Sequence, residues 1–325
     1  MLKIGFLGDN LPISGGNVCI YDYALGNKNI LHNQSIILAA KDKIHPLVYE
    51  KLRKDIDILL YSSQEELETW IKDLHLDAIY QLSADGNYIP YYGIKTLIHY
   101  VFQCSPIKNQ LLLGGHSNEI RSTAVSKWLA QRDGFDIYVP HIVWLPPTTE
   151  NLRKELGIPE DAIVFGRYGS YDTFDIDWVK QALIELKNEH NIWFLFMNTK
   201  QFWIGAQSYR PDNFIFLPAS TDLYEKRKFI NTCDAMLHAR SRGETFGLAP
   251  MEFSFCNKPV YSWFGSPERA HIDQLGDKGV YYSNAEELKA LIYAHKKEYN
   301  QRDWNCTLEF APEKVMKKFE EVFLS

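Results

Sequence analysis

The sequence predicts an α/β protein with two domains in tandem. Short apolar runs typical of buried strands alternate with amphipathic helical segments, the pattern of parallel sheets covered by helices on both faces. The alternation is interrupted near residue 148 by paired prolines and a short polar segment, as in linkers between domains. A chain of 325 residues also suits two domains of roughly 150 residues each.

The first predicted domain covers residues 1–148 and begins with a strand at 2–7. A glycine-containing loop and a helix follow this strand. An amphipathic helix is predicted over 64–74, and Ser126 is a suitable N-cap for a helix that ends before Gly134. Four further apolar runs predict the other strands of this domain: 35–40, 58–61, 78–82 and 96–102.

The second predicted domain covers residues 149–310 and repeats the alternation. Asn284 and Glu287 form an N-cap and capping-box pair that opens a helix over 285–297. A last segment, 311–325, forms a helix with one apolar stripe. The strands predicted for the second domain are 163–167, 192–197, 213–217, 235–238 and 259–262.

Composition disfavours several function classes. The 35 Lys and Arg against 41 Asp and Glu give a net charge of −6, which argues against nucleic acid as a partner because that binding rests on clustered basic residues. The five cysteines show no Cys-x-x-Cys spacing, so we expect reduced thiols in a cytoplasmic protein. No apolar stretch approaches the roughly 20 residues that span a bilayer. A peripheral contact with a membrane surface stays open.

Several familiar catalytic motifs are absent from the sequence. It contains no Gly-x-Gly-x-x-Gly after the first strand, no P-loop, no His-Glu-x-x-His and no Gly-x-Ser-x-Gly. A plain dinucleotide oxidoreductase, a P-loop enzyme and an α/β-hydrolase are therefore disfavoured.

The segment with the most chemical content is 240–259, RSRGETFGLAPMEFSFCNKP. Two carboxylates, Glu244 and Glu252, flank seven residues that include a Thr-Phe-Gly turn. If Gly247 opens a helix, the first N–H groups of that helix lack intrahelical partners and form an anion site. The side chain of Glu252 then leans back toward that end. The arrangement suits a ligand with hydroxyls at both ends and a diphosphate between them, such as a nucleotide sugar.

The Glu, seven residues, Glu pattern resembles the motif of retaining GT-B glycosyltransferases of the large family 4 type. The resemblance implies two Rossmann-like domains whose parallel sheets face a central cleft. It implies that Glu244 contacts the transferred sugar and that Glu252 binds the ribose hydroxyls. The residues of the turn and helix start are implied to lie at the donor: Phe246, Gly247 and Leu248.

Other parts of the chain carry the same resemblance. Gly15 and Gly16, after the first strand, resemble the family's glycine loop near the diphosphate and acceptor. Gly166-Arg167 resembles its Gly-Arg pair, whose Arg binds the diphosphate, and 229–239 and 257–260 resemble the strands around the Glu motif.

The family also has a histidine near the donor sugar. His99 is the first candidate and His116 the second, although a lone histidine in a strand is more often a satisfied structural residue. Asp85-Gly86-Asn87 follows a predicted strand at the edge where open α/β sheets bind ligands, or is an ordinary turn.

The chain departs from the family pattern at the diphosphate. The family carries a lysine a few residues after the Gly-Arg pair, and here that stretch reads YGSYDTFDID, with no Lys or Arg. Three cations elsewhere are candidate substitutes, and the sequence does not rank them: Lys200, Arg240 and Arg242.

The resemblance implies transfer of a hexose-type sugar from a UDP- or GDP-linked donor to a hydroxyl of a glycan or another acceptor, with retention. Arg167 and the helix start would stabilise the departing diphosphate, and no cofactor beyond the donor substrate is expected. Asp175-Ile176-Asp177 fits an Asp-x-Asp pattern but opens a helix, so the expected enzyme is metal-independent. The last helix, over 311–325, is expected to return to the first domain and to act as a hinge with the 148–152 linker.

Two alternatives remain open at this point. A non-catalytic nucleotide-sugar or glycan-binding module is favoured by the missing lysine. A sugar phosphorylase or a nucleotide-sugar epimerase could use the same fold.

Overall fold

The computed structural model describes residues 1–8, 10–11, 15–84, 94–102, 120–202 and 211–325. These residues form two compact units. The first unit contains Met1–Ile142 and Glu309–Ser325, and the second contains Val143–Leu308. Among the described helices, none combines the length and the apolar character that a membrane crossing would require.

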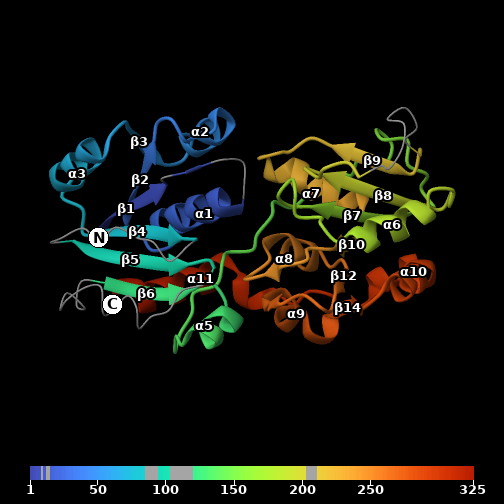
Figure 1. The fold of residues 1–325 in the computed structure, drawn as a ribbon. Helices are drawn as coiled ribbons and strands as arrows, with labels where there is room; N and C mark the ends of the chain where they lie inside the picture. The colour runs from blue at the N-terminus through green and yellow to red at the C-terminus, as the bar shows by residue number, and fades with distance from the viewer. Residues whose placement is uncertain (9, 12–14, 85–93, 103–119, 203–210) are drawn as a thin grey trace. The chain divides into compact units, whose positions relative to one another are not determined.

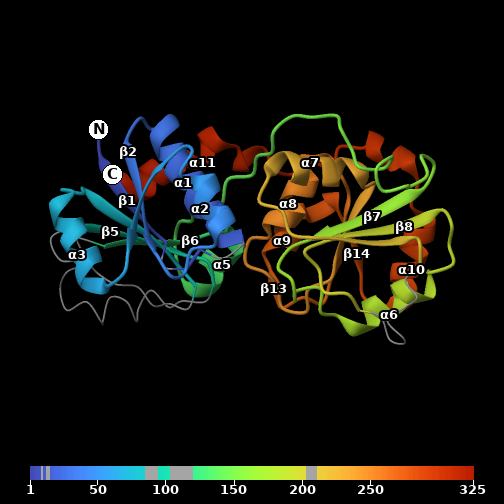
Figure 2. The ribbon, with the colours of Figure 1, turned by 90° about the horizontal axis from the view of Figure 1, so that it is seen from above.

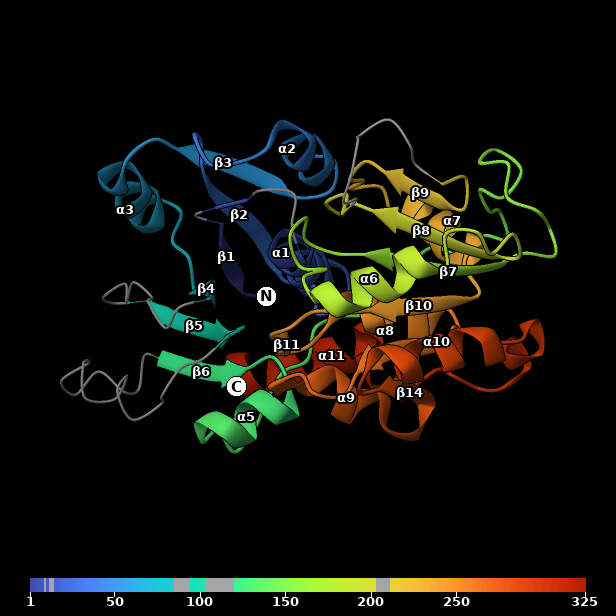
Figure 3. The same ribbon diagram turned by 45° about the vertical axis from the view of Figure 1, so that its right-hand side comes forward.

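The first unit is built on a six-stranded sheet in which every neighbouring pair is parallel. Its order is β3-β2-β1-β4-β5-β6, the Rossmann order, and it can be followed strand by strand in Figure 3. The strands are β1 (Lys3–Gly8), β2 (Gln34–Ala40), β3 (Asp57–Tyr61), β4 (Ala78–Ser83), β5 (Lys95–Tyr100) and β6 (Ile120–Ala124).

Helices cover both faces of this sheet (Figure 2). On one face α3 buries Leu67 and Ile71 against strand residues such as Leu38. On the other face α1 packs against both the sheet and the C-terminal helix α11. The helices of the unit are α1 (Gly15–Asn29), α2 (Pro46–Leu52), α3 (Gln64–Asp73), α5 (Lys127–Asp133) and α11 (Pro312–Phe319), which continues as a π-helical turn, η5 (Glu320–Leu324).

The C-terminal helix belongs to the first unit because its apolar stripe is buried there. Phe319 stacks on Tyr23 of α1 with ring centroids 5.5 Å apart, and Phe323 meets the ring of Tyr80 edge-on. Gly26 permits the close approach of α1 and α11, since a Cβ at this position would lie 2.7 Å from the sulfur of Met316. This packing excludes the alternative in which the helix lies only against residues 150–300.

The second unit repeats the architecture with another parallel six-stranded sheet, of order β14-β12-β10-β7-β8-β9 (Figure 1). Read from its first strand, this is again the Rossmann order. Its strands are β7 (Ile163–Tyr168), β8 (Ile192–Met197), β9 (Phe214–Leu217), β10 (Ala235–His238), β12 (Val260–Trp263) and β14 (Gly279–Tyr282). A separate parallel pair joins β11 (Gly243–Glu244) to β13 (Glu268–Arg269).

Two helix layers enclose this sheet. On one face α6 (Asp177–Glu185) and α10 (Ala285–Ala294) bury Val179, Leu183, Leu288 and Ile292 in the core. On the other face lie α7 (Leu223–Thr232), α8 (Leu248–Phe255) and α9 (Ala270–Leu275) (Figure 2). Three short 3₁₀ turns complete the described elements: η2 (Gly276–Lys278), η3 (Lys297–Gln301) and η4 (Leu308–Phe310).

Candidate active site

The site predicted in the second unit lies at the switch point of its sheet. β7 and β10 are neighbours, and the following strands, β8 and β12, lie on opposite sides of them. In open α/β sheets, ligands bind outside the carboxyl ends of two such strands. The loops that leave these ends are joined by Asp175, whose carboxylate accepts bonds from the backbone N–H of Ser241 at 2.6 Å and from its hydroxyl at 2.7 Å.

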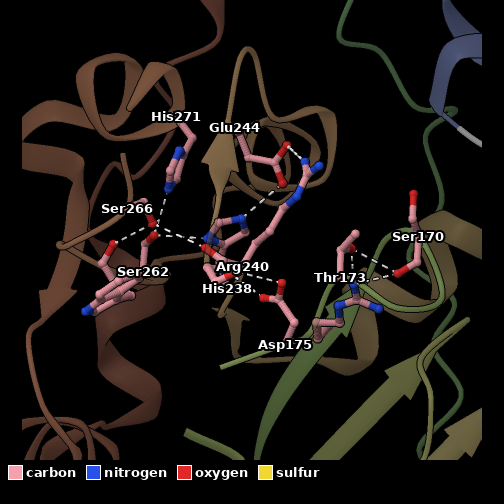
Figure 4. A network of polar contacts seen from close by, with 12 residues as sticks. Ser170, Thr173, Asp175, His238, Arg240, Glu244, Ser262, Ser266 and His271 are labelled. Carbon is pink, nitrogen blue, oxygen red and sulfur yellow. Dashed lines mark hydrogen bonds and ion pairs between the residues drawn. The ribbon is translucent and has the colours of Figure 1, made fainter. Parts of the chain in front are cut away.

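Glu244 projects into this region from the short strand β11, whose pairing with β13 fixes its backbone. Arg240 donates to its Oε2 at 2.6 Å, and His238 contacts its Oε1 at 3.2 Å (Figure 4). The side chain keeps 19% exposure. Burial raises the pKa of Glu244, but the hydrogen bond from His238 and the charge of Arg240 outweigh it and hold the pKa below its usual value. Glu244 is therefore an anchored carboxylate at neutral pH.

Helix α8 begins beside Glu244 with an open N-terminus. Its N-cap, Gly247, has a φ of 88° and provides no side-chain cap. A Cβ at this glycine would lie 3.2 Å from the Cβ of Glu244, so both the backbone and the packing require glycine. The N–H groups of Leu248 and Ala249 are in the first turn, where no intrahelical acceptor exists for them. An anion is stabilised at such a helix start.

Phe246, predicted to bind the donor, is 2% exposed. Its side chain is therefore buried within the second unit.

Arg167 does not offer a free guanidinium to a phosphate. It lies on β7, is 4% exposed, and donates through Nη1 to Asn198 O and Thr199 Oγ1. Through Nη2 it donates to Ser170 O at 2.9 Å and Thr173 Oγ1 at 2.7 Å. Burial lowers its pKa to about 10, and Glu244 partly offsets this. In place of the direct phosphate contact expected from the sequence, Arg167 joins the loop after β7 to the loop after β8.

Glu252, the second motif carboxylate, lies on α8 and is 4% exposed. Lys226 of α7 donates to its Oε1 at 2.8 Å, and the hydroxyl of Tyr168 donates to its Oε2. Burial and the neighbouring Glu252 raise the pKa of Tyr168 well above its ordinary value. Lys226 carries no signal in the sequence, because it lies on a helix rich in charged residues with no spacing that singles it out.

The three candidate substitutes for the missing lysine occupy different places. Arg240 is bound to Glu244 within the site. Arg242 is 52% exposed and pairs with Glu268 of β13 at 2.9 Å. Lys200 is exposed in the loop after β8, where its backbone N–H donates to Tyr171 O at 3.0 Å. Of the three, Arg240 lies closest to the Glu244 carboxylate.

In the first unit, the structure contradicts the catalytic role expected for His99. Its side chain is fully buried in β5, and both ring nitrogens are engaged, with Tyr80 Oη at 2.7 Å and Val139 O at 2.8 Å. Burial lowers its pKa to about 4. His99 is therefore a satisfied core histidine.

The other residues predicted for the site in the first unit lie in a helix or outside the described residues. Gly15 and Gly16 form the start of α1 instead of a loop. His116 and 85–87 lie outside the described residues.

The described residues contain no group of three or more His, Cys, Asp or Glu side chains arranged to hold a metal. Asp175 is bound to Ser241, and Asp177 pairs with Lys180 at 2.8 Å in the first turn of α6.

No protein-family model matches the sequence, and no curated protein matches it. Several solved structures are similar to the structure of this chain. A glycosyltransferase from Rickettsia africae is 14% identical, with a TM-score of 0.71 over 99% of this chain and 98% of that one. HepE of Anabaena, crystallised with UDP and glucose, is 15% identical, with a TM-score of 0.72 over all of both chains. WaaG, a glycosyltransferase involved in lipopolysaccharide biosynthesis, is 11% identical, with a TM-score of 0.58 over 98% and 96%. These similarities establish a GT-B fold with two Rossmann-like sheets.

Proposed function

We propose that this chain is a retaining glycosyltransferase of the family 4 type. It moves a hexose-type sugar from a UDP- or GDP-linked donor to a hydroxyl acceptor. The observation that carries the proposal is the anchored carboxylate of Glu244 beside the open start of α8, at the switch point of the sheet. A fold shared with HepE, which binds UDP and glucose, supports the same donor class.

The proposed reaction places opposite charges where the site can stabilise them. The departing diphosphate lies at the start of α8, where Leu248 and Ala249 supply backbone N–H groups. Arg240 gives one hydrogen bond to Glu244, and a guanidinium has five N–H groups, so donors remain for phosphate oxygens. Positive charge on the transferred sugar faces the Glu244 carboxylate. Arg240 thus supplies the positive charge that a lysine provides in the family. The proposed reaction needs no metal or cofactor.

Glu252 is the proposed ribose ligand. A carboxylate accepts about four hydrogen bonds, and Lys226 and Tyr168 use two of them. The remaining acceptor sites of this carboxylate, which is 4% exposed, are assigned to the ribose hydroxyls. The first unit is proposed to bind the acceptor.

One observation favours a second function, a non-catalytic nucleotide-sugar-binding module. The terminal N–H groups of Arg167 are all used within the protein, which removes the cation that the family motif assigns to the leaving group. Release of free UDP or GDP in the presence of an acceptor separates the two functions, because a binding module retains the intact nucleotide sugar.

The proposal is tested by a thermal-shift screen of nucleotide sugars followed by calorimetry. A ligand at 100 times its Kd stabilises by about 2.7 kcal/mol, which such a screen detects readily. We expect a UDP- or GDP-linked sugar to bind, and Arg240→Met to weaken that binding at least tenfold, the loss of a charged hydrogen bond. Arg242→Met is the matched control and should bind normally. Equal affinity in both variants would contradict the placement of the diphosphate.

A further inference from the structure

A line of buried polar side chains runs from Glu244 into the second unit. His238 Nδ1 lies 3.1 Å from Ser262 Oγ, and Ser262 Oγ lies 3.0 Å from His271 Nε2 (Figure 4). The two imidazole rings are 4.5 Å apart. We call these three residues the histidine–serine chain. It links β10, β12 and α9 to the Glu244 carboxylate.

The histidine–serine chain is sealed from solvent. Ser262 and His271 have no exposed surface and His238 is 5% exposed. The backbone of His238 is fixed as well, because Tyr282 donates its hydroxyl to the His238 carbonyl at 2.8 Å. Three polar side chains buried without solvent are costly unless their donors and acceptors match in order.

The carboxylate at one end sets the direction of the hydrogen bonds. An ionised carboxylate only accepts, so His238 Nε2 must carry the proton that it donates to Glu244. If His238 is neutral, its Nδ1 is an acceptor and takes the Ser262 hydroxyl proton. The oxygen of Ser262 then accepts from the Nε2–H of His271. Every contact is satisfied in this order.

The far end of the line agrees with this direction. His271 Nδ1 is buried and has no hydrogen-bond partner among the described residues. In the order just given, this nitrogen carries no proton, and the ring of His271 is neutral. The reverse order, with a doubly protonated His238, would place an N–H at this atom, and an orphaned buried donor is the rarer and costlier state.

The surroundings of His271 also favour a neutral ring at that position. Burial lowers the pKa of His271 well below its usual value, and the positive charges of Arg269 and Arg240 lower it further. Arg167 adds a third guanidinium near Glu244, and Glu244 supplies the negative charge that faces these groups.

We propose that the histidine–serine chain, held in one tautomeric order, positions the Glu244 carboxylate for the donor sugar. His238 is the positioning residue, and Ser262 and His271 hold its tautomer. This inference rests on the proposed function for its catalytic consequence, but the order of the hydrogen bonds can be tested without it.

The first test is long-range ¹H–¹⁵N correlation NMR on the full chain labelled at histidine. Signals are assigned by their loss in His238→Gln and His271→Gln. The expected result at neutral pH is a neutral Nε2–H tautomer at both positions. An imidazolium or an Nδ1–H tautomer at His238 would overturn the proposal, whatever the protein catalyses.

The second test measures kcat and KM with the donor found by screening. His238→Ala should lower kcat about tenfold or more, the effect of losing a hydrogen bond to a charged group. His238→Gln should recover most of it, because the Gln amide donates to Glu244 and its oxygen accepts from Ser262. The kcat of Ser262→Ala should lie between those of His238→Ala and His238→Gln.

His295→Ala is the matched control. His295 is also buried in the second unit and bonds to Tyr261 at 2.8 Å, away from Glu244. It should lose stability while kcat stays within about twofold. Equal kcat losses in His238→Ala and His295→Ala, or no rescue by Gln, would refute positioning. If wild-type protein turns over no donor, the proposed function fails. The NMR result still decides the direction of the hydrogen bonds in the histidine–serine chain.

Discussion

Replacing Lys226 by Met should destabilise the second unit strongly. Lys226 and Glu252 form an ion pair at 2.8 Å with side chains only 12% and 5% exposed. Removing the ammonium leaves the carboxylate buried beside Tyr168 alone. Breaking a buried pair in this way costs about 3–5 kcal/mol. At roughly 2–4 °C per kcal/mol for a unit of this size, the melting temperature should fall by about 6–20 °C.

The assay is calorimetric melting of the full chain, with a control on the same helix. Lys228 also pairs with a carboxylate, Glu150, but both side chains are more exposed, at 25% and 68%. Lys228→Met should therefore shift the transition by no more than about 2 °C, because exposed pairs contribute little. Glu252→Gln should cost less than Lys226→Met, since a lysine left without its partner can extend toward water.

The double variant completes the cycle. Lys226→Met with Glu252→Gln removes both charges and keeps an acceptor for the Tyr168 hydroxyl, so most of the stability should return. A coupling below about 0.5 kcal/mol, or a loss in Lys226→Met no greater than in Lys228→Met, would refute the buried-pair argument. The double variant also provides a stable protein in which the ribose role of Glu252 can be measured.

Three further predictions follow from single residues. Gly247→Ala, which forces a Cβ against Glu244, should weaken donor binding at least tenfold by calorimetry, whereas Gly157→Ala, with positive φ but open space around it, should only lower the melting temperature. Arg167→Lys keeps the charge but loses the paired N–H donors of the guanidinium. In urea unfolding it should therefore lower the stability of the protein by about 1 kcal/mol per lost hydrogen bond. Because the pKa of His99 falls to about 4 on folding, the unfolded chain binds protons first, and stability declines as pH drops below about 6.5. Between pH 7 and pH 5, His99→Gln should lose about 2 kcal/mol less unfolding free energy than wild type, measured by urea unfolding.

Strands with continuous apolar runs and helices with clear caps could be predicted from the sequence. The strand predicted at 235–238 is β10, and Ser126 and Asn284 are the N-caps of α5 and α10. The edge strand β6 was missed because its sequence, IRSTA, is polar and partly exposed, so no apolar run marks it. β11 and β13 are too short to carry a periodic signal.

The site was predictable where neighbours in sequence decide the geometry. The open start of α8 at Gly247 follows from a local turn, and the structure confirms that the helix begins there. Arg167 and Glu252 were predicted as ligands of the donor, but the sequence does not show that both are buried against partners far along the chain, Thr199 and Lys226. His238 had one usable signal, a polar residue at the carboxyl end of a buried strand two positions before Arg240.

Glycosyl transfer through Glu244 is tested by nucleoside-diphosphate release from wild type and Glu244→Gln, with the donor and acceptor found by screening. Wild type should release UDP or GDP in step with glycosylated product. Glu244→Gln should lower kcat by about a hundredfold, the size of effect seen when an electrostatic stabiliser is removed, while the Kd for the free diphosphate stays within a few-fold. Wild-type turnover in Glu244→Gln would exclude a catalytic role for this carboxylate, and no diphosphate release by a wild-type protein that binds its donor would exclude glycosyl transfer.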